Sequence, residues 1–408
     1  MNAFNRIVVV GGGQAAAQAI DTLRRQGHRG SIALIADEPQ LPYQRPPLSK
    51  KLLAGSLDHS RLLLRPQTYY AEHGIECHLG CRALEIDRGQ QRVYTDRGPA
   101  LSYDALLLAT GTRPRLLAVP GADLAGIHYL RTIADVAQLR RELHVGRRLV
   151  IVGGGYIGLE VAATCRDLGL DVTILEMTER LMGRVVCMET SAFFEEEHVR
   201  RGVHVFREAR VQSFESDSNG RVCSVRCEDG SKHAADVVLI GVGAVANEQL
   251  ALAAGLECAN GIVVDASCRT SDPHIYAAGD CTNFFSARYG RRMRLESVDN
   301  AYEQGILAAT AILGALPGPA KVPWFWSDQY DLKLIIVGLS AGYDQTLLRG
   351  RPFDRSFSVC YLRNGELLAI DTINHPKDQM AARKFVGTGL RPALHKLADP
   401  DCPLKDCS

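Results

Sequence analysis

One local pattern, an apolar run followed by a glycine-rich turn and a helix, occurs twice in this chain and restricts the folds open to it. In the first copy, the apolar run 7–10 leads into the turn 11–16, a helical pattern to Leu23 and a second apolar run, 32–35. Short continuous apolar runs are typical of buried parallel strands. Strand, glycine turn, helix and strand in this order predict a dinucleotide-binding unit.

The glycines of the first turn have separate roles in such a unit. Gly11 permits a sharp turn, and Gly13 lets backbone N–H groups approach a pyrophosphate at the positive end of the helix. The third position of the pattern holds Ala16 in place of glycine. Asp37 follows the second strand and can accept hydrogen bonds from ribose hydroxyls. Taken alone, this copy also fits a glycine turn that binds nothing.

The second copy matches the pattern more closely. The apolar run 149–152 precedes the turn, a helix is expected to about Leu168, and a strand over 172–175 ends at Glu176. All three glycines of the pattern are present: Gly153, Gly155 and Gly158. Two copies in one chain predict two dinucleotide sites, because each copy would have to arise independently if neither bound a ligand.

Glu176 discriminates between nicotinamide cofactors. A carboxylate at the ribose favours a free 2′-hydroxyl and repels a 2′-phosphate, so Glu176 predicts NAD(H) rather than NADP(H). Arg180 and Arg184 follow it and would blur this preference. Alternatively, Arg184 would reach the pyrophosphate or the adenine of NAD.

Two further apolar runs, 106–108 and 237–240, each close on a small-residue turn and are expected to be the last strands of the two units. A later short strand delivers Asp280 at its end, where the carboxylate can hydrogen-bond a ribityl hydroxyl of a flavin. A helical stretch, 301–313, follows. N–H groups at the beginning of this helix, near Val298, would face a developing negative charge.

The segment before Lys50 predicts a helix and a local partner for that lysine. Pro46 and Pro47 fix an extended path, and Ser49 can cap a helix that continues through Leu53. Lys50 then lies near the helix beginning, where a cation is mildly unfavourable. A nearby partner is therefore expected, the alternative being a solvated lysine.

A boundary is expected at residues 317–319, where Pro, Gly and Pro follow one another. Beyond it the composition changes, and both tryptophans, Trp324 and Trp326, occur close together. The remaining pattern predicts a small α+β domain with strands over 334–337, 357–362 and 367–370 and a helix over 378–386.

The bulk composition limits the kinds of partner. The chain has 408 residues, 46% of them hydrophobic, and a formal net charge of +1. This length suggests two or three domains of ~150 residues, and so small a charge predicts no recruitment of nucleic acid or anionic membrane. No secretion signal precedes the first strand, and no apolar stretch reaches the ~20 residues of a membrane-spanning helix. A cytoplasmic protein is expected.

The 12 cysteines do not form a recognisable metal site. Their spacing makes neither paired zinc knuckles nor an iron–sulfur run, so free thiols and no bound metal are expected. Residues 11–62 contain no cysteine, which argues against a disulfide-reductase or peroxidase mechanism beside a bound flavin.

Together these motifs make the chain resemble the flavoprotein NADH:ferredoxin reductases of oxygenase systems, the family of putidaredoxin reductase and the biphenyl dioxygenase ferredoxin reductase. The resemblance extends over nearly the whole chain. It rests on the two glycine turns and on segments 45–50, 270–280, 296–298 and 325–329. It implies a glutathione-reductase-like α/β fold with two Rossmann-like dinucleotide-binding domains, for FAD and NAD, and a small α+β C-terminal domain.

The resemblance also implies domain boundaries and site residues. The FAD domain would comprise 1–111 and 244–318, the NAD domain 112–243 and the C-terminal interface domain 319–408. The implied FAD contacts are Gly11, Gly13, Ala15, Asp37, Arg45, Lys50, Ala83, Arg131, Asp280, Glu296 and Val298. The implied NAD contacts are Gly153, Gly155, Tyr156, Ile157, Glu176, Arg184 and Gly243.

Three residues are implied to serve catalysis. Lys50 would lie beside the flavin N5 and pair with Glu160, and Trp326 would lie near the flavin and nicotinamide rings. The implied reaction takes a hydride from NADH onto FAD and passes single electrons to a [2Fe–2S] ferredoxin that serves a cytochrome P450 or Rieske oxygenase. Rubredoxin is the less favoured acceptor, and a monomer or weak homodimer is expected.

The sequence departs from the family pattern at Ala16 and at Ala246, which replaces a proline before Asn247 and would loosen the return between domains. Two alternatives remain: an NADH oxidase without a protein partner, and a redox binding protein of apoptosis-inducing-factor type. For ferredoxin docking, the basic candidates are Arg291, Arg292, Arg294, Lys333, Arg349, Arg351 and Lys384.

Overall fold

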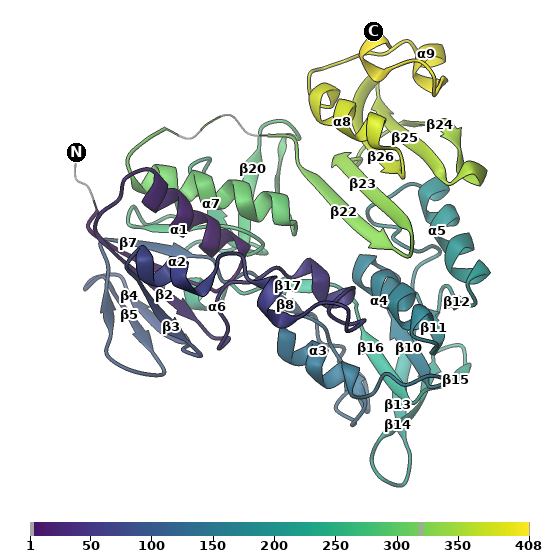
Figure 1. Cartoon of the computed structure of the whole chain (residues 1–408), viewed down its shortest axis with the longest axis horizontal. Helices are drawn as coiled ribbons and strands as arrows, with labels where there is room; N and C mark the ends of the chain where they lie inside the picture. Colours follow the sequence, from purple (N-terminus) through teal and green to yellow (C-terminus); the bar gives the residue numbers. More distant parts are fainter. Residues whose placement is uncertain (1–3, 317, 319–320, 408) are drawn as a thin grey trace. The chain divides into compact units, whose positions relative to one another are not determined.

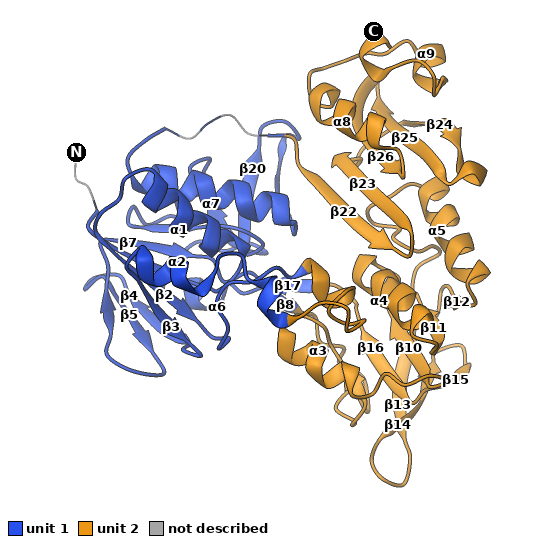
Figure 2. Cartoon of the chain, in the orientation of Figure 1, with its two compact units in different colours: residues 1–45, 59–113, 244–321 blue, residues 46–58, 114–243, 322–408 orange. Residues whose placement is uncertain are grey.

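The computed structural model describes residues 4–316, 318 and 321–407 (Figure 1). Of the expected boundary, Pro317 and Pro319 lie outside the described residues. The chain forms two compact units, each assembled from three stretches (Figure 2). Unit 1 comprises Met1–Arg45, His59–Arg113 and Ala244–Lys321, and unit 2 comprises Pro46–Asp58, Pro114–Gly243 and Val322–Ser408.

Unit 1 is built on a five-stranded parallel sheet. Its strand order is β19 (Ile275–Ala277), β7 (Ala105–Leu108), β1 (Arg6–Val10), β2 (Ser31–Ala36) and β3 (Ile75–Leu79). The predicted strands are confirmed, except that β19 rather than β7 ends the sheet. The apolar run of β7 carries no sign of a further neighbouring strand, because β19 comes from residues far away in the chain.

The two faces of this sheet are covered differently. Ile7 and Val9 pack with α1 (Gln14–Arg25) and α7 (Val298–Ile312) on one face, and Val8 and Val10 face a second core on the other. This alternation follows from the two-residue period of a strand. The second face is covered by these elements: β4 (Ala83–Asp87), β5 (Arg92–Thr95), β6 (Leu101–Ser102), α6 (Gln249–Ala253), β18 (Ile262–Val264) and β20 (Thr282–Ser286). The strand β21 (Arg291–Met293) pairs with β20. A short helix, α2 (Gln67–Glu72), precedes β3.

Unit 2 contains the second parallel sheet, as the repeated pattern predicts, but the run 237–240, expected to be its last strand, has a further strand beside it. Its strand order is β12 (His204–Phe206), β11 (Asp171–Leu175), β10 (Arg148–Val152), β16 (Val237–Ile240) and β9 (Ile127–His128). The other elements of this part are α3 (Ile133–Arg140), α4 (Tyr156–Asp167), α5 (Met188–Arg200) and the sheet β13 (Val211–Ser216), β14 (Val222–Cys227) and β15 (Lys232–Ala234).

The C-terminal part of unit 2 is an antiparallel sheet with helices on one face. Its strand order is β22 (Trp324–Gln329), β23 (Leu332–Gly338), β26 (Glu366–Ile373), β25 (Ser356–Arg363) and β24 (Gln345–Arg351). Two helices, α8 (Pro376–Phe385) and α9 (Leu394–Ala398), pack on one face of this sheet, and α5 packs on the other through Phe193 against Phe357. The α/β fold class with a small α+β C-terminal part is confirmed.

The helix predicted after Ser49 is wrong. Residues Pro46–Ser49 form a 3-10 helix, and turns rather than an α-helix follow. The backbone N–H groups of Lys50 and Leu52 both donate to the Pro47 carbonyl, at 3.1 and 2.9 Å. The Ser49 hydroxyl donates to the Glu160 carboxylate instead of capping a helix. The Ser49 side chain is therefore not available to cap a helix, because it binds Glu160, an acid far away in the chain.

Candidate functional site

The first glycine turn has the geometry of a phosphate-binding turn. Gly11 has a φ of +123°, and a Cβ there would lie 2.1 Å from the Ala109 carbonyl oxygen. At Gly13, which precedes α1, a Cβ would meet no atom within 4 Å. No side chain caps this end of α1, and its first turn contains no acid. Within the part of the chain that the structure describes, no side chain caps the N–H groups at the beginning of α1, and Gly13 borders open space.

The second glycine turn has the same geometry in unit 2. Gly153 has a φ of +107°, Gly155 borders open space, and no side chain caps α4. A Cβ at Gly158 would lie 2.2 Å from the Gly153 carbonyl oxygen, so this position requires glycine. The equivalent position of the first copy, Ala16, holds a fully buried methyl group, which that turn accommodates.

Both turns fit the pyrophosphate of a dinucleotide. A helix N-terminus attracts anions through its unpaired N–H groups and its dipole, and the open space beside Gly13 and Gly155 leaves room for the backbone to be approached closely. The residues present at both turns thus fit the pyrophosphate of a dinucleotide such as FAD or NAD(H).

The two acids at the strand ends have different surroundings. The Asp37 side chain is 61% exposed, and its carboxylate lies 3.9 Å from the Arg82 guanidinium. The Glu176 carboxylate accepts hydrogen bonds from the backbone N–H groups of Gly154 at 2.7 Å and Thr178 at 2.8 Å. Glu176 is therefore fixed against the second glycine turn, where a ribose would meet it.

In unit 1, Asp280 is held next to the beginning of α7 by a residue that the sequence analysis did not identify. The buried Gln304 side chain of α7 accepts hydrogen bonds from Gly279 N–H at 2.7 Å and from the Thr282 hydroxyl at 2.8 Å. Ser297 caps α7 by accepting from the Asn300 N–H, which leaves the Val298 N–H beside the cap. A glutamine inside a helical run carries no local sign of this role.

Arg45 belongs to a compact polar group in unit 1. Its guanidinium lies 2.7 Å from the Glu38 carboxylate and donates to the Tyr43 hydroxyl at 3.2 Å. Burial acts to lower the pKa of Arg45, but the charges of Tyr43, Glu38 and Asp280 outweigh it, so this pKa is raised. Arg45 therefore stays charged.

In unit 2 the predicted Lys50–Glu160 ion pair is present. The ammonium nitrogen of Lys50 lies 2.7 Å from Glu160 Oε2, and the two side chains are 18% and 7% exposed. The Ser49 hydroxyl donates to the same oxygen at 2.5 Å, and the Ser327 hydroxyl donates to Oε1 at 2.8 Å. The two serines lie 111 and 167 residues from Glu160 along the chain, so no local sequence pattern identifies them as its partners.

β22, the strand that carries Ser327, also carries three consecutive aromatic side chains. The rings of Trp326 and Trp324 are stacked with centroids 5.3 Å apart, and the Phe325 ring lies 4.6 Å from that of Tyr156. Tyr156 begins α4, so β22 and the second glycine turn are in contact within unit 2. Trp326 directly precedes Ser327, and because successive side chains of a strand point to opposite faces, its ring packs against the core that includes Ala382 of α8.

The other predicted residues are distributed over both units. In unit 1, Ala15 is buried in α1, Ala83 begins β4, and exposed Glu296 forms an ion pair with Arg294. In unit 2, the side chains of Ile157 (47% exposed) and Arg184 are exposed. Gly243 has a φ of +104°, and a Cβ there would meet no atom within 4 Å. Arg131 precedes the capping box of α3, and its N–H donates to Asp135.

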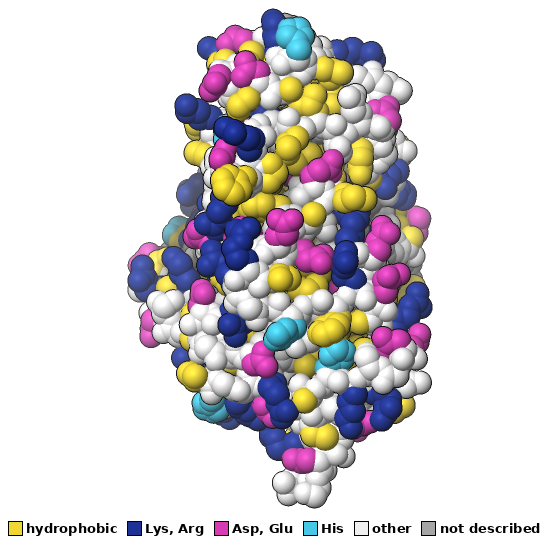
Figure 3. Space-filling model, turned by 90° about the vertical axis from the view of Figure 1, so that its right-hand side faces the viewer, with side chains coloured by type: hydrophobic (Ala, Val, Ile, Leu, Met, Phe, Trp, Pro, Cys, Tyr) yellow, Lys and Arg dark blue, Asp and Glu magenta, His cyan; other side chains and the backbone are white. Residues whose placement is uncertain are grey.

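The basic docking candidates are not equivalent. Arg291 and Arg292 are exposed on β21, and Lys333, Arg351 and Lys384 are exposed elsewhere. Arg349 is only 2% exposed and pairs with buried Asp378 at 2.7 Å, so its assignment to a docking surface is wrong. On the face drawn in Figure 3, basic and acidic side chains are interspersed.

Over the ranges that the structure describes, every helix is too short or too polar to cross a lipid bilayer.

Two family models match the chain. Residues 5–305 match the pyridine nucleotide-disulphide oxidoreductases, and residues 324–408 match the reductase C-terminal domain. Putidaredoxin reductase of Pseudomonas putida is 42% identical over 100% of this chain and 97% of its own. The ferredoxin–NAD(+) reductase component of the biphenyl dioxygenase system of Paraburkholderia xenovorans is 38% identical over 99% of this chain and 98% of its own.

Solved structures agree with these relatives. A covalent putidaredoxin reductase–putidaredoxin complex contains a chain that is 42% identical, with a TM-score of 0.96 over 99% of this chain and 98% of that chain. A ferredoxin reductase from Rhodopseudomonas palustris is 40% identical, with a TM-score of 0.94 over 98% of both chains. The chain therefore belongs to the pyridine nucleotide-disulphide oxidoreductases, and within them to the ferredoxin reductases that carry the reductase C-terminal domain.

Proposed function

We propose that the protein is an FAD-dependent NADH:ferredoxin oxidoreductase that supplies a [2Fe–2S] ferredoxin of a cytochrome P450 or Rieske oxygenase system. The observation that carries the proposal is the pair of uncapped helix N-termini at Gly13 and Gly155, one for each dinucleotide. Full-length similarity to ferredoxin reductases supports the choice of acceptor. The cytoplasm, where NADH is available, is the compartment in which we propose that it acts.

The proposed organisation assigns 1–111 and 244–318 to the FAD domain, 112–243 to the NAD domain and 319–408 to a C-terminal interface domain. Backbone N–H groups at the first glycine turn and at the beginning of α7, with the side chains of Asp37, Arg45 and Asp280, would hold FAD. The second glycine turn and Glu176 would hold NADH.

FAD, when bound, supplies the conversion of a two-electron hydride donor into a source of single electrons. The chain's own residues position and insulate that chemistry. Lys50, held in its ion pair with Glu160, would present an N–H donor, and the Trp326 ring would supply an apolar wall that excludes water. The stretch 11–62 contains no cysteine, so it offers no redox-active disulfide on α1 or in the segment that follows that helix.

Stopped-flow reduction by NADH and by NADPH, followed by mixing with a panel of ferredoxins and a rubredoxin, tests the proposal. We expect rapid bleaching of the flavin band with NADH, slower bleaching with NADPH because Glu176 repels the 2′-phosphate, and fast reoxidation by a [2Fe–2S] ferredoxin. Equally fast oxygen consumption with and without ferredoxin would instead identify an NADH oxidase.

Reversing the charges of Arg291 and Arg292 to glutamate is expected to slow ferredoxin reduction on the order of 10-fold or more at low salt, because exposed charges steer association. Reduction of ferricyanide by NADH, which requires no protein docking, should persist. The control changes two other exposed arginines to glutamate, Arg29 and Arg210. Equal losses with both acceptors would contradict this docking surface.

A further inference from the structure

A buried line of polar side chains continues from the Lys50–Glu160 pair into the C-terminal sheet. Both carboxylate oxygens of Glu160 are occupied by protein donors: Oε2 by Lys50 and Ser49, and Oε1 by Ser327. The Ser327 hydroxyl in turn accepts from the amide nitrogen of Gln329 at 3.2 Å. Ser327 and Gln329 are both 0% exposed, so water does not compete for these contacts.

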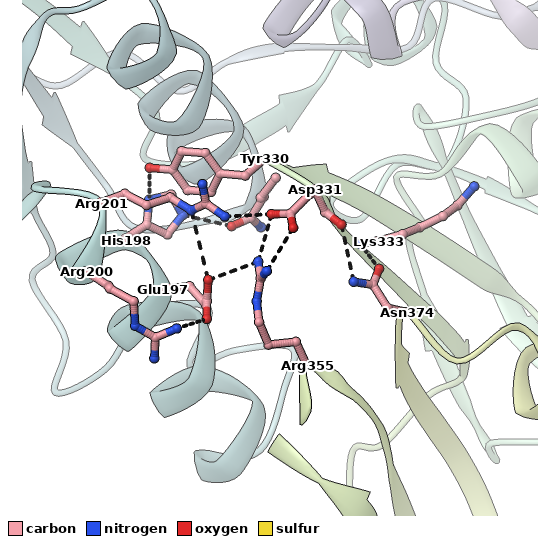
Figure 4. A network of polar contacts seen from close by, with 10 residues as sticks. Glu197, His198, Arg200, Arg201, Tyr330, Asp331, Lys333, Arg355 and Asn374 are labelled. Carbon is pink, nitrogen blue, oxygen red and sulfur yellow. Dashed lines mark hydrogen bonds and ion pairs between the residues drawn. The ribbon is translucent and has the colours of Figure 1, made fainter. Parts of the chain in front are cut away.

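The line extends to a histidine on α5. The Gln329 amide oxygen lies 2.9 Å from Nε2 of His198, and the Tyr330 hydroxyl lies 3.3 Å from Nδ1 of the same ring. Figure 4 shows His198 and Tyr330 at this end of the line. His198 is fully buried, and burial lowers its pKa to about 4, so the ring is neutral at physiological pH.

The chemistry of these groups gives the line a direction. A carboxylate only accepts, so Ser327 must donate to Glu160 and must accept from the Gln329 amide N–H. The amide oxygen of Gln329 then requires a donor, which fixes the proton of neutral His198 on Nε2 and leaves Nδ1 to accept from Tyr330. Every donor in the line therefore points toward Glu160.

The far end of the line is held rigidly. Glu197, next to His198, is 2% exposed and pairs with Arg200 at 2.6 Å and Arg355 at 3.2 Å. Asp331, next to Tyr330, pairs with Arg355 at 2.7 Å, and with Arg201 at 2.6 Å (Figure 4). These ion pairs connect α5 to the turn between β22 and β23, next to His198 and Tyr330.

We propose that Ser327, Gln329 and His198 are positioning residues for the Lys50–Glu160 pair. They fix the Glu160 carboxylate through Oε1, whereas Lys50 contacts Oε2, and Glu160 in turn fixes the Lys50 ammonium. The catalytic meaning of this inference rests on the proposed function, whereas its geometry does not. Because a glutamine amide releases protons reluctantly, the line orders the pair and does not conduct protons to it.

The test compares Ser327→Ala and Gln329→Leu with a matched control, Ser358→Ala. Ser358 is also fully buried in the C-terminal sheet and donates to a carboxylate, Asp378, at 2.8 Å, but it lies outside the line. In selectively ¹⁵N-labelled full-length holoprotein, we follow the ring nitrogens of His198 and the side-chain ammonium of Lys50. Melting temperatures confirm that each variant is folded.

In the unaltered protein, His198 should show a single neutral tautomer with its proton on Nε2, and Lys50 an ammonium signal protected from exchange. Gln329→Leu should shift the tautomer signal, Ser327→Ala should weaken the Lys50 signal, and Ser358→Ala should change neither. Both variants of the line should lower kcat for NADH oxidation on the order of 10-fold, with KM little changed, because the pair is misplaced after binding.

Unchanged His198 and Lys50 signals in both variants of the line would overturn the inference, as would equal effects of Ser358→Ala. Failure of the unaltered protein to reduce any ferredoxin would contradict the proposed function alone, because the two NMR signals report on the line without turnover.

Discussion

Replacing Arg349 with methionine is expected to lower the free energy of unfolding by about 3–5 kcal/mol, the usual cost of leaving one member of a buried ion pair alone. Arg349 and Asp378 have side chains that are 2% and 4% exposed. The guanidinium also donates to carbonyls of the C-terminal segment, those of Leu397, Asp399, Pro400 and Cys402. The substitution therefore leaves the buried Asp378 carboxylate without its ion-pair partner and removes the hydrogen bonds that hold the segment after α8.

The measurement is urea unfolding followed by tryptophan fluorescence. The chain has two tryptophans, Trp324 and Trp326, and both lie on β22, so the signal reports on the C-terminal sheet. Arg351→Met is the control, because Arg351 is 83% exposed and its ion pair with Asp354 should contribute no more than about 1 kcal/mol. Similar unfolding midpoints for the two variants would show that the buried pair is not a major source of stability.

Replacing Gly11 with alanine is expected to destabilise unit 1 by about 2–6 kcal/mol. A non-glycine residue at a φ of +123° carries a strain of about 1–3 kcal/mol. The added Cβ would also lie 2.1 Å from the Ala109 carbonyl oxygen, and overpacking of this kind costs about 1–3 kcal/mol more. Thermal melting of the apoprotein measures this loss separately from cofactor binding.

Replacing Gly13 with alanine should leave the stability of the apoprotein nearly unchanged but lower its affinity for FAD. The backbone there has a φ of −103°, and the Cβ would enter open space, so the melting temperature of the apoprotein should barely change. The methyl group would instead stand where the pyrophosphate approaches α1, and FAD affinity should fall on the order of 10-fold or more, which is about 1.4 kcal/mol. Unaltered FAD affinity in Gly13→Ala would contradict the placement of FAD at this turn.

The glycine turns were predictable because their requirements are local. A strand end, a positive φ and a close approach between backbones are properties of a few consecutive residues, and only glycine satisfies them at Gly11 and Gly153. The same holds for the central strands, whose continuous apolar runs require burial on both faces. The roles of Asp37, Glu176 and Asp280 toward cofactors stay predictions.

Ala246 stands where the family pattern has a proline, and hydrogen bonds of the next residue stabilise this segment. Its neighbour Asn247 donates from N and Nδ2 to the carbonyls of Gly111 and Thr110, both at 2.9 Å, and accepts from the Thr110 hydroxyl at 2.7 Å. Three hydrogen bonds thus hold the return segment in unit 1. The loosening expected from the missing proline is therefore opposed by contacts that the sequence pattern does not reveal.

What the sequence by itself determined is the repeated strand–turn–helix unit and the acids at the strand ends, because periodicity and glycine sterics act over short distances along the chain. Only the tertiary structure decided what Ser49, Ser327 and Arg349 do. Ser49 had the residue type of a helix cap and Arg349 that of a surface cation, yet each is held by a carboxylate far away in the chain. A buried carboxylate must be hydrogen-bonded, and its donors are the groups that the folded chain places next to it, whatever their distance along the sequence.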